Sequence, residues 1–400
     1  MDLPDDGHDH DWWGEPVWQI MANPGATVAP QEVVGRESVV AEVVDSAIGR
    51  GALLFGDRRM GKTAVLGPVM ALLEGGPFVV LQVGGETGRP EVLEARLADA
   101  LRRHARFRSE LAAWDIEVDL MRGPFKLRRS RQRAEATQDD LFRWAAKASE
   151  PDRLVLVMDE VTEAAKAFAS TPVGSAGFLH ELRNARETLP NVSMIFSGSV
   201  GLHHVVRDMG PVNDLRAVRV GPLAFDDACY LARCLLAGTP GVSVPPTLER
   251  PVCEALAEAT NGIAFYLHHL VHDLGRHRAA ATPELVADLL TAAIESPEDP
   301  WHLGHYRDRL ESYYGADAPL LELILDEYAA SGATGIDPML HHLRTIGEER
   351  DRAGLVRLVE LLERDYYLRR SSDGTDEFDS SLIRRYWRHL RRLGDGGPIV

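Results

Sequence analysis

This chain of 400 residues contains little lysine, little cysteine and no long apolar run. Only four of its 44 basic residues are lysines, and its three cysteines, Cys229, Cys234 and Cys253, fall in predicted helices without the spacing of metal ligands. We therefore expect buried thiols rather than a zinc site or a disulfide framework. No apolar stretch approaches the ~20 residues of a membrane span, and residues 1–30 lack the basic and apolar regions of a secretory signal. These absences predict a cytoplasmic protein without membrane contact.

The charge balance is strongly acidic. Asp and Glu together number 61, so the formal net charge is −17. Such a charge repels polyanions, and only a local basic patch could bind nucleic acid. The length and a hydrophobic content of 45% predict about two to three domains, each with its own core. The 15 histidines are scattered or form adjacent pairs, which do not face one site on a helix, so we expect no histidine metal centre.

One of the four lysines, Lys62, lies in a complete phosphate-binding loop, the pattern G-x-x-x-x-G-K-[ST]. The matched residues are Gly56, Asp57, Arg58, Arg59, Met60, Gly61, Lys62 and Thr63, followed by Ala64. The glycines let the backbone fold around phosphates, and N–H groups at the helix start attract anions. Lys62 offers a compact ammonium between the β- and γ-phosphates, and Thr63 a hydroxyl for Mg²⁺. The motif predicts ATP and Mg²⁺ as cofactors; an ordinary strand-to-helix turn is the alternative.

The surroundings of the loop agree with this interpretation. Residues 51–56 are short and apolar, as in a buried parallel strand, and residues 62–74 show helical periodicity. The expected apolar face of this helix contains Leu66, Val69, Met70 and Leu73. Strand, glycine turn and helix therefore follow one another in the order that a phosphate loop requires.

A second apolar run supplies acidic partners. Residues 154–158 are followed directly by Asp159 and Glu160. The carboxyl end of a buried parallel strand opens toward the phosphate crevice, so Asp159 is the candidate Mg²⁺ ligand and Glu160 the candidate general base. Taken alone, the pattern is also typical of a strand leaving the core.

Several further segments are similar to those of the STAND and archaeal-type ATPases. The matching segments are residues 33–37 before the loop, 193–199 in a fourth strand, 220–223, 260–267, 364–368 and 378–387. The resemblance implies an α/β fold, with a P-loop NTPase parallel sheet core followed by a helical lid and a winged-helix domain. It also implies that Gly35 and Arg36 lie against the adenine and that Ser197 ends the fourth strand at the nucleotide site.

The chain departs from related AAA+ patterns in two respects. Ser197 and Ser199 stand where an Asn or a Thr-Arg pair is common, and no lid arginine is directed at the γ-phosphate. Arg183, on the helix before the fourth strand, is the candidate to reach a neighbouring subunit's nucleotide; a solvated helix arginine is the alternative.

Breaks in the pattern predict the domain boundaries. We expect an amino-terminal arm over residues 1–30, partly disordered or bound to a partner, and a P-loop core over 31–224. A helical lid should cover 225–294 and a winged helix 295–400. The predicted strands lie near 51–56, 78–83, 153–158, 193–198 and 216–220.

Two regions are rich in arginine. Residues 102–108 and 122–133 flank an alternating segment, 116–120, that is typical of a hairpin strand, and residues 384–392 crowd the last predicted helix. Each is either a solvated helical face or a nucleic-acid surface. Tyr386 and Trp387 need burial on that last helix, which favours an internal role.

Together these patterns predict an ATPase with low basal turnover that acts as a STAND/AAA-like molecular switch. It would control assembly with a protein partner or with itself. The alternative is an ATP-dependent DNA-binding protein, initiator-like or regulatory, that uses its winged helix. A phosphotransferase is less well supported, because no acceptor site is recognisable.

Overall fold

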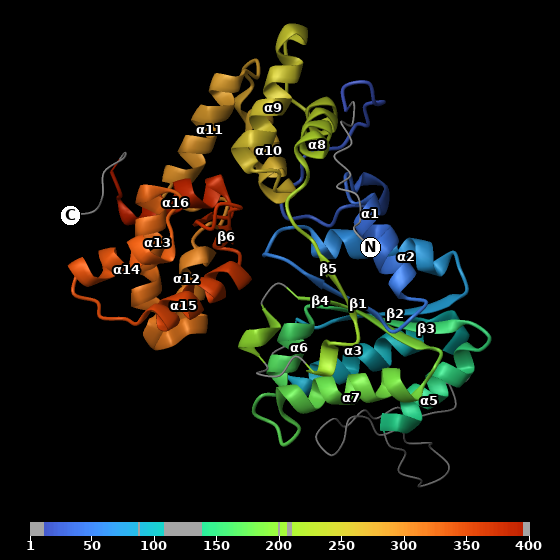
Figure 1. Ribbon diagram of the computed structural model, residues 1–400. Helices are drawn as coiled ribbons and strands as arrows, with labels where there is room; N and C mark the ends of the chain where they lie inside the picture. Colours follow the sequence, from blue (N-terminus) through green and yellow to red (C-terminus); the bar gives the residue numbers. More distant parts are fainter. Residues whose placement is uncertain (1–11, 87–88, 108–137, 199–200, 206–209, 395–400) are drawn as a thin grey trace. The chain divides into compact units, whose positions relative to one another are not determined.

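The computed structural model describes residues 12–86, 89–107, 138–198, 201–205 and 210–394 (Figure 1). The chain divides into two compact units. The sheet unit contains Thr27–Gly221, and the helical unit combines the amino-terminal residues up to Ala26 with the residues from Pro222 onwards.

The sheet unit is built around five parallel strands in the order β2-β3-β4-β1-β5. They are β1 (Gly51–Phe55), β2 (Phe78–Gly84), β3 (Arg153–Asp159), β4 (Val192–Ser197) and β5 (Arg216–Arg219). Each predicted strand agrees with the observed one to within one residue at either end. The predicted α/β parallel core is therefore confirmed. Its order places the carboxyl ends of β1, β3 and β4 side by side at one edge of the sheet.

Helices cover both faces of this sheet (Figure 1). One face carries α1 (Glu37–Ser46) and α2 (Lys62–Glu74); the other carries α3 (Pro90–Arg103), α5 (Gln138–Ser149), α6 (Val161–Ala167) and α7 (Gly174–Thr188). Short 3₁₀ helices are η1 (Pro30–Glu32), η2 (Leu202–His204) and η3 (Gly210–Val212). Helix α2 has the predicted bounds. Leu66, Val69 and Leu73 are buried as expected, whereas Met70 is half-buried.

The core on the α3 side follows from strand alternation. Val79, Leu81 and Val83 of β2 point to this face and join one hydrophobic cluster with Leu97 of α3 and Leu182 of α7. Burial of both faces explains why the strands read as nearly continuous apolar runs.

The first helices of the helical unit are α8 (Phe225–Gly238), α9 (Glu249–Thr260), α10 (Ala264–His277) and α11 (Pro283–Glu295), with η4 (Pro246–Leu248). Residues 12–22 bind to this group. Trp12 is 3% exposed, Arg233 Nη1 donates to the Trp13 carbonyl oxygen at 2.7 Å, and the Ile20 N–H donates to the Cys234 carbonyl oxygen at 3.2 Å. These residues differ from the disordered or partner-bound arm that we expected, because their apolar side chains are buried within the chain itself.

The three cysteines lie on α8 and α9, and all are buried as predicted. Burial in apolar surroundings raises the pKa of Cys229 to about 12. This thiol therefore stays protonated and unreactive at neutral pH.

The carboxyl-terminal part of the helical unit surrounds a second aromatic core. Its elements are α12 (His305–Tyr314), η5 (Gly315–Asp317), α13 (Ala318–Ser331), α14 (Ile336–Thr345), α15 (Arg352–Arg364), β6 (Leu368–Arg370), β7 (Asp376–Phe378) and α16 (Ser381–Arg391). Strands β6 and β7 form an antiparallel hairpin, and Thr334 adds an isolated bridge to Asp376. Large side chains fill the centre: Trp301, Tyr306, Tyr328, Tyr367 and Trp387. No helix among the described residues is both long and apolar enough to cross a membrane.

Candidate nucleotide site

The phosphate loop connects β1 to α2 with strained backbone at defined positions. Gly56 has φ 153° and Gly61 has φ 87°, both in the range that favours glycine. A Cβ atom on Gly56 would clash with the carbonyl oxygen of Val220, so this close approach also requires glycine. Arg59 adopts φ 70°. Asp57, 1% exposed, accepts a hydrogen bond from the Arg58 N–H at 2.7 Å. The loop is thus a fixed turn at the start of α2, before Ala64.

Lys62 is directed into this loop. Its Nζ donates to the carbonyl oxygens of Gly56 at 2.9 Å and Asp57 at 2.6 Å, and the residue is 5% exposed. A buried ammonium must have hydrogen-bond partners, and here the loop backbone supplies two of them. The charge is therefore held at the centre of the loop.

Asp159 joins the loop to two strands. Thr63 Oγ1 donates to Asp159 Oδ2 at 2.8 Å, and Ser197 Oγ donates to Asp159 Oδ1. Ser197 reaches this position because it ends β4, between β1 and β3 in the sheet. The structure thus brings together the three predicted residues with a Mg²⁺ or nucleotide role. A hydroxyl beside a carboxylate is a donor set suited to Mg²⁺, which prefers oxygen ligands.

Glu160 follows Asp159 in a left-handed conformation, with φ 53° and ψ 49°. Its N–H donates to Asp159 Oδ1 at 3.1 Å and to Ser197 Oγ at 3.4 Å. This conformation is uncommon for residues other than glycine and costs free energy, so surrounding contacts must hold it. One such contact is the approach of Gly85, where a Cβ atom would clash with the Glu160 carbonyl oxygen. The side chain of Glu160 is half-buried.

Arg36 and Gly35 lie on the amino-terminal side of α1. Gly35 has φ 66°, and Arg36 is 8% exposed. Arg36 Nη2 donates to the carbonyl oxygens of Met60 at 3.1 Å and Gly221 at 2.6 Å. This guanidinium therefore ties the phosphate loop to the segment after β5, a role that the sequence did not indicate.

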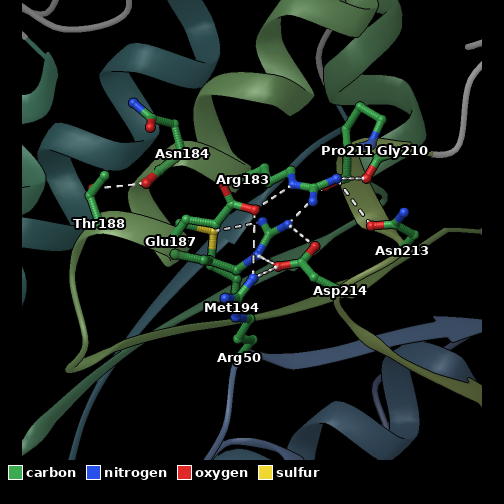
Figure 2. A network of polar contacts seen from close by, with 11 residues as sticks. Arg50, Arg183, Asn184, Glu187, Thr188, Met194, Gly210, Pro211, Asn213 and Asp214 are labelled. Atoms are coloured by element: carbon green, nitrogen blue, oxygen red, sulfur yellow. Dashed lines mark hydrogen bonds and ion pairs between the residues drawn. The ribbon is translucent and has the colours of Figure 1, made fainter.

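Arg183 lies in a separate polar network on α7 (Figure 2). Its Nε donates to Glu187 at 2.8 Å, and its Nη1 donates to Asn213 Oδ1 at 3.0 Å and to the Gly210 carbonyl oxygen. Arg50 also pairs with Glu187, at 3.6 Å. This network shares no residue with the contacts around Asp159.

Sequence reasoning missed Arg186, one turn along α7 from Arg183. Its fully buried side chain pairs with Asp214 at 2.8 Å and donates to the Pro211 carbonyl oxygen at 2.8 Å. Burial raises the pKa of the Asp214 carboxyl, but the hydrogen bond and charge of Arg186 outweigh it and hold this pKa below its usual value. The pair fixes the segment that leads into β5. An arginine on a helix gives no signal in the sequence that it will be buried.

The arginine-rich regions are largely engaged within the chain where they are described. Arg106 Nη1 pairs with Asp152 at 2.5 Å, and Arg103 pairs with Asp99. The second cluster, 122–133, the alternating segment 116–120, Arg108 and Ser199 lie outside the described residues. On α16, the cations contact other helices of the helical unit: Arg384, Arg385, Arg388 and Arg391 reach Ala329, Thr291, Asp326 and Glu322.

No protein-family model matches the sequence, and no curated protein is significantly similar to it. Solved structures do resemble its fold. A Walker-type ATPase of Pyrococcus abyssi is 18% identical, with a TM-score of 0.67 over 92% of this chain and 100% of that one. The ORC2 protein of Aeropyrum pernix, in ADPNP–ADP complexes, is 12% identical, with a TM-score of 0.53 over 91% and 95% of the two chains. The chain therefore has the P-loop ATPase fold of the AAA-like type.

Proposed function

We propose that this protein binds and hydrolyses ATP and acts as a STAND/AAA-like molecular switch in the cytoplasm. The observation that carries the proposal is the set of contacts that joins Thr63, Asp159 and Ser197 beside the buried ammonium of Lys62. A phosphate loop alone is a turn. A phosphate loop whose hydroxyl meets a carboxylate from a second strand is a place for a metal–triphosphate.

Each residue has a role in this proposal. Lys62 exchanges its contacts with Gly56 and Asp57 for phosphate oxygens, and Thr63 and Asp159 would hold Mg²⁺. Bound Mg²⁺ neutralises charge on the phosphates. Glu160 accepts a proton from the attacking water.

Other residues would shape the site. Gly35 and Arg36 would border the adenine side, with Arg36 keeping the loop in register with the segment after β5. We assign residues 31–224 to the ATPase core, 225–294 to a lid and 295–400 to a winged helix.

Charge in the helical unit favours a protein partner over DNA. The arginines of α16 contact α11 and α13, and Tyr386 and Trp387 of the same helix are buried. Helix α15 carries three arginines but also two glutamates, and Asp373 lies in the β6–β7 turn. A helix that enters a DNA groove needs cations available for phosphates. The proposed output is therefore assembly with a protein or with a second copy.

Calorimetric titration with Mg-ATP tests the binding site. Wild-type protein should bind, and Lys62→Ala should show no detectable binding while its circular dichroism spectrum stays unchanged. The matched control is Lys147→Ala, because Lys147 is exposed on α5. Wild-type affinity in the Lys62 variant would remove the nucleotide from this loop.

Two further measurements test the switch and its alternative. Solution scattering with and without a non-hydrolysable ATP analogue should differ, since a nucleotide shifts an equilibrium only by contacting two arrangements differently. Superimposable profiles would contradict a switch. Binding to duplex DNA that weakens steeply with salt would support the DNA-binding alternative.

A further inference from the structure

Strand β2 lies at one edge of the sheet, and β3 is its only hydrogen-bonded strand neighbour among the described residues. An edge strand directs a row of backbone N–H and C=O groups away from its neighbour, and these groups can accept a further strand. Natural proteins usually cover or charge such an edge. The edge of β2 therefore needs an explanation.

A groove of about 490 Å³ follows this edge, lined by residues 80–84 of β2 and by Arg96, Arg103 and His104 at the carboxyl-terminal half of α3. We name it the β2 groove. Neighbouring side chains of a strand point to opposite faces, so a groove lined by five consecutive residues runs along the strand edge.

The lining of the β2 groove contains two guanidinium groups and no carboxylate. Arg96 Nη1 donates to the Gly84 carbonyl oxygen at 2.7 Å, at the last residue of β2. Arg103 pairs with Asp99, but their side chains are 76% and 48% exposed, so water screens this pair. The groove is therefore electropositive although the whole chain is acidic.

We propose that the β2 groove binds an extended, acidic segment of a partner protein, which adds a strand to the edge of β2. Backbone groups of β2 provide the main-chain hydrogen bonds, and Arg96 and Arg103 select carboxylates on alternate residues. A helix cannot use the row of strand donors, because its own backbone groups are already paired. Nucleic acid offers no N–H row and meets a net charge of −17.

The same strand contacts the candidate nucleotide site. Gly84 pairs in register with Asp159, and the Gly85 N–H donates to the Asp159 carbonyl oxygen at 2.7 Å. A docked strand would restrain the backbone that carries Asp159 and Glu160. This effect on turnover rests on the proposed ATPase activity, whereas docking itself needs no nucleotide.

The test uses full-length protein without nucleotide and a fluorescent eight-residue peptide of alternating valine and glutamate. Fluorescence anisotropy should show binding, with a Kd raised roughly tenfold by Arg96→Ala or Arg103→Ala. Arg102→Ala is the matched control, because Arg102 lies on the same helix but does not line the groove. Two peptide controls should bind at least about tenfold more weakly. One replaces glutamate by lysine, and the other carries N-methyl groups on alternate amides, which prevents strand pairing.

Four results would overturn the proposal. They are no binding of the acidic peptide, equal binding of the N-methylated peptide, unchanged affinity in both arginine variants, and displacement of the peptide by duplex DNA. A variant in which a short Gly-Ser linker replaces residues 108–137 identifies a competing occupant. If only that variant binds the peptide, the chain's own segment occupies the groove. Because no nucleotide is present, these results are independent of the Lys62 titration.

Discussion

The hydroxyl of Thr63, at the start of α2, donates a hydrogen bond of 2.8 Å to the carboxylate of Asp159, at the end of β3. These residues are 96 positions apart in the sequence. The contact exists because the strand order places only β4 between β1 and β3, so that the carboxyl ends of all three strands share one edge. Ser197 of β4 completes the arrangement by donating to the other oxygen of the same carboxylate.

Glu160 and Asp159 should have separable effects on ATP chemistry. Glu160→Gln keeps the shape of the side chain but removes the base, so ATP should remain bound while turnover falls by about 10²–10⁴-fold. Asp159→Asn should instead weaken the Mg²⁺-dependent part of ATP binding. Phosphate release and calorimetric titration, with and without Mg²⁺, distinguish the two. Unchanged turnover in Glu160→Gln would assign the base elsewhere, and no turnover in the wild type would leave a binding switch only.

Ser197→Ala should reduce apparent Mg²⁺ affinity by about 10- to 100-fold, because loss of a hydrogen bond that orients a metal ligand has effects of this size. A Mg²⁺ titration of ATP binding provides the measurement. Ser193→Ala is the matched control on the same strand: its buried hydroxyl has no hydrogen-bond partner among the described residues, so its removal should leave affinity and stability unchanged. Equal Mg²⁺ dependence in the two variants would show that Ser197 does not position Asp159.

Basal turnover should be low and should rise with protein concentration. A phosphate-loop site hydrolyses slowly until positive charge is added from a lid or a neighbour, and Arg183 is our candidate for that charge. Arg183→Ala should remove the concentration dependence. Arg50→Ala is the control, since Arg50 shares the partner Glu187 with Arg183. Specific activity independent of concentration, or insensitive to Arg183→Ala, would leave a self-contained enzyme.

Stability of the helical unit should decrease with rising pH through Glu363. Burial, and then the hydrogen bond with Asp376, raises the pKa of Glu363 above its ordinary value. A carboxyl with a raised pKa in the folded state binds its proton more tightly when folded. Its stabilising effect is therefore complete below the unfolded-state pKa and is lost as pH rises through the folded-state value.

The variant Glu363→Gln should accordingly lose less thermal stability than the wild type between pH 4 and pH 8, because an amide does not ionise. Differential scanning calorimetry across this range measures the Tm of each protein. Glu349→Gln, at an exposed position before α15, should follow the wild-type curve. Parallel curves for Glu363→Gln and the wild type would show that this carboxyl does not control the pH response.

Local patterns in the sequence were sufficient for the parallel sheet and for the loop. Helix α2 and the five strands have the predicted places, because apolar runs, glycines and helical periodicity are properties of adjacent residues. The types of the site residues were also predictable, since a phosphate loop requires Lys62 and Thr63 and an acidic strand end provides Asp159 and Glu160.

Tertiary structure alone decided which of these groups touch and where the arginines go. The strand order brings Ser197 to Asp159, and the fold directs Arg36 to the loop backbone and buries Arg186 against Asp214. These contacts join residues far apart in the chain, and no short pattern records such pairs. An arginine has the same appearance in the sequence whether it is solvated or buried, because only the surrounding fold supplies the partners that compensate its desolvation.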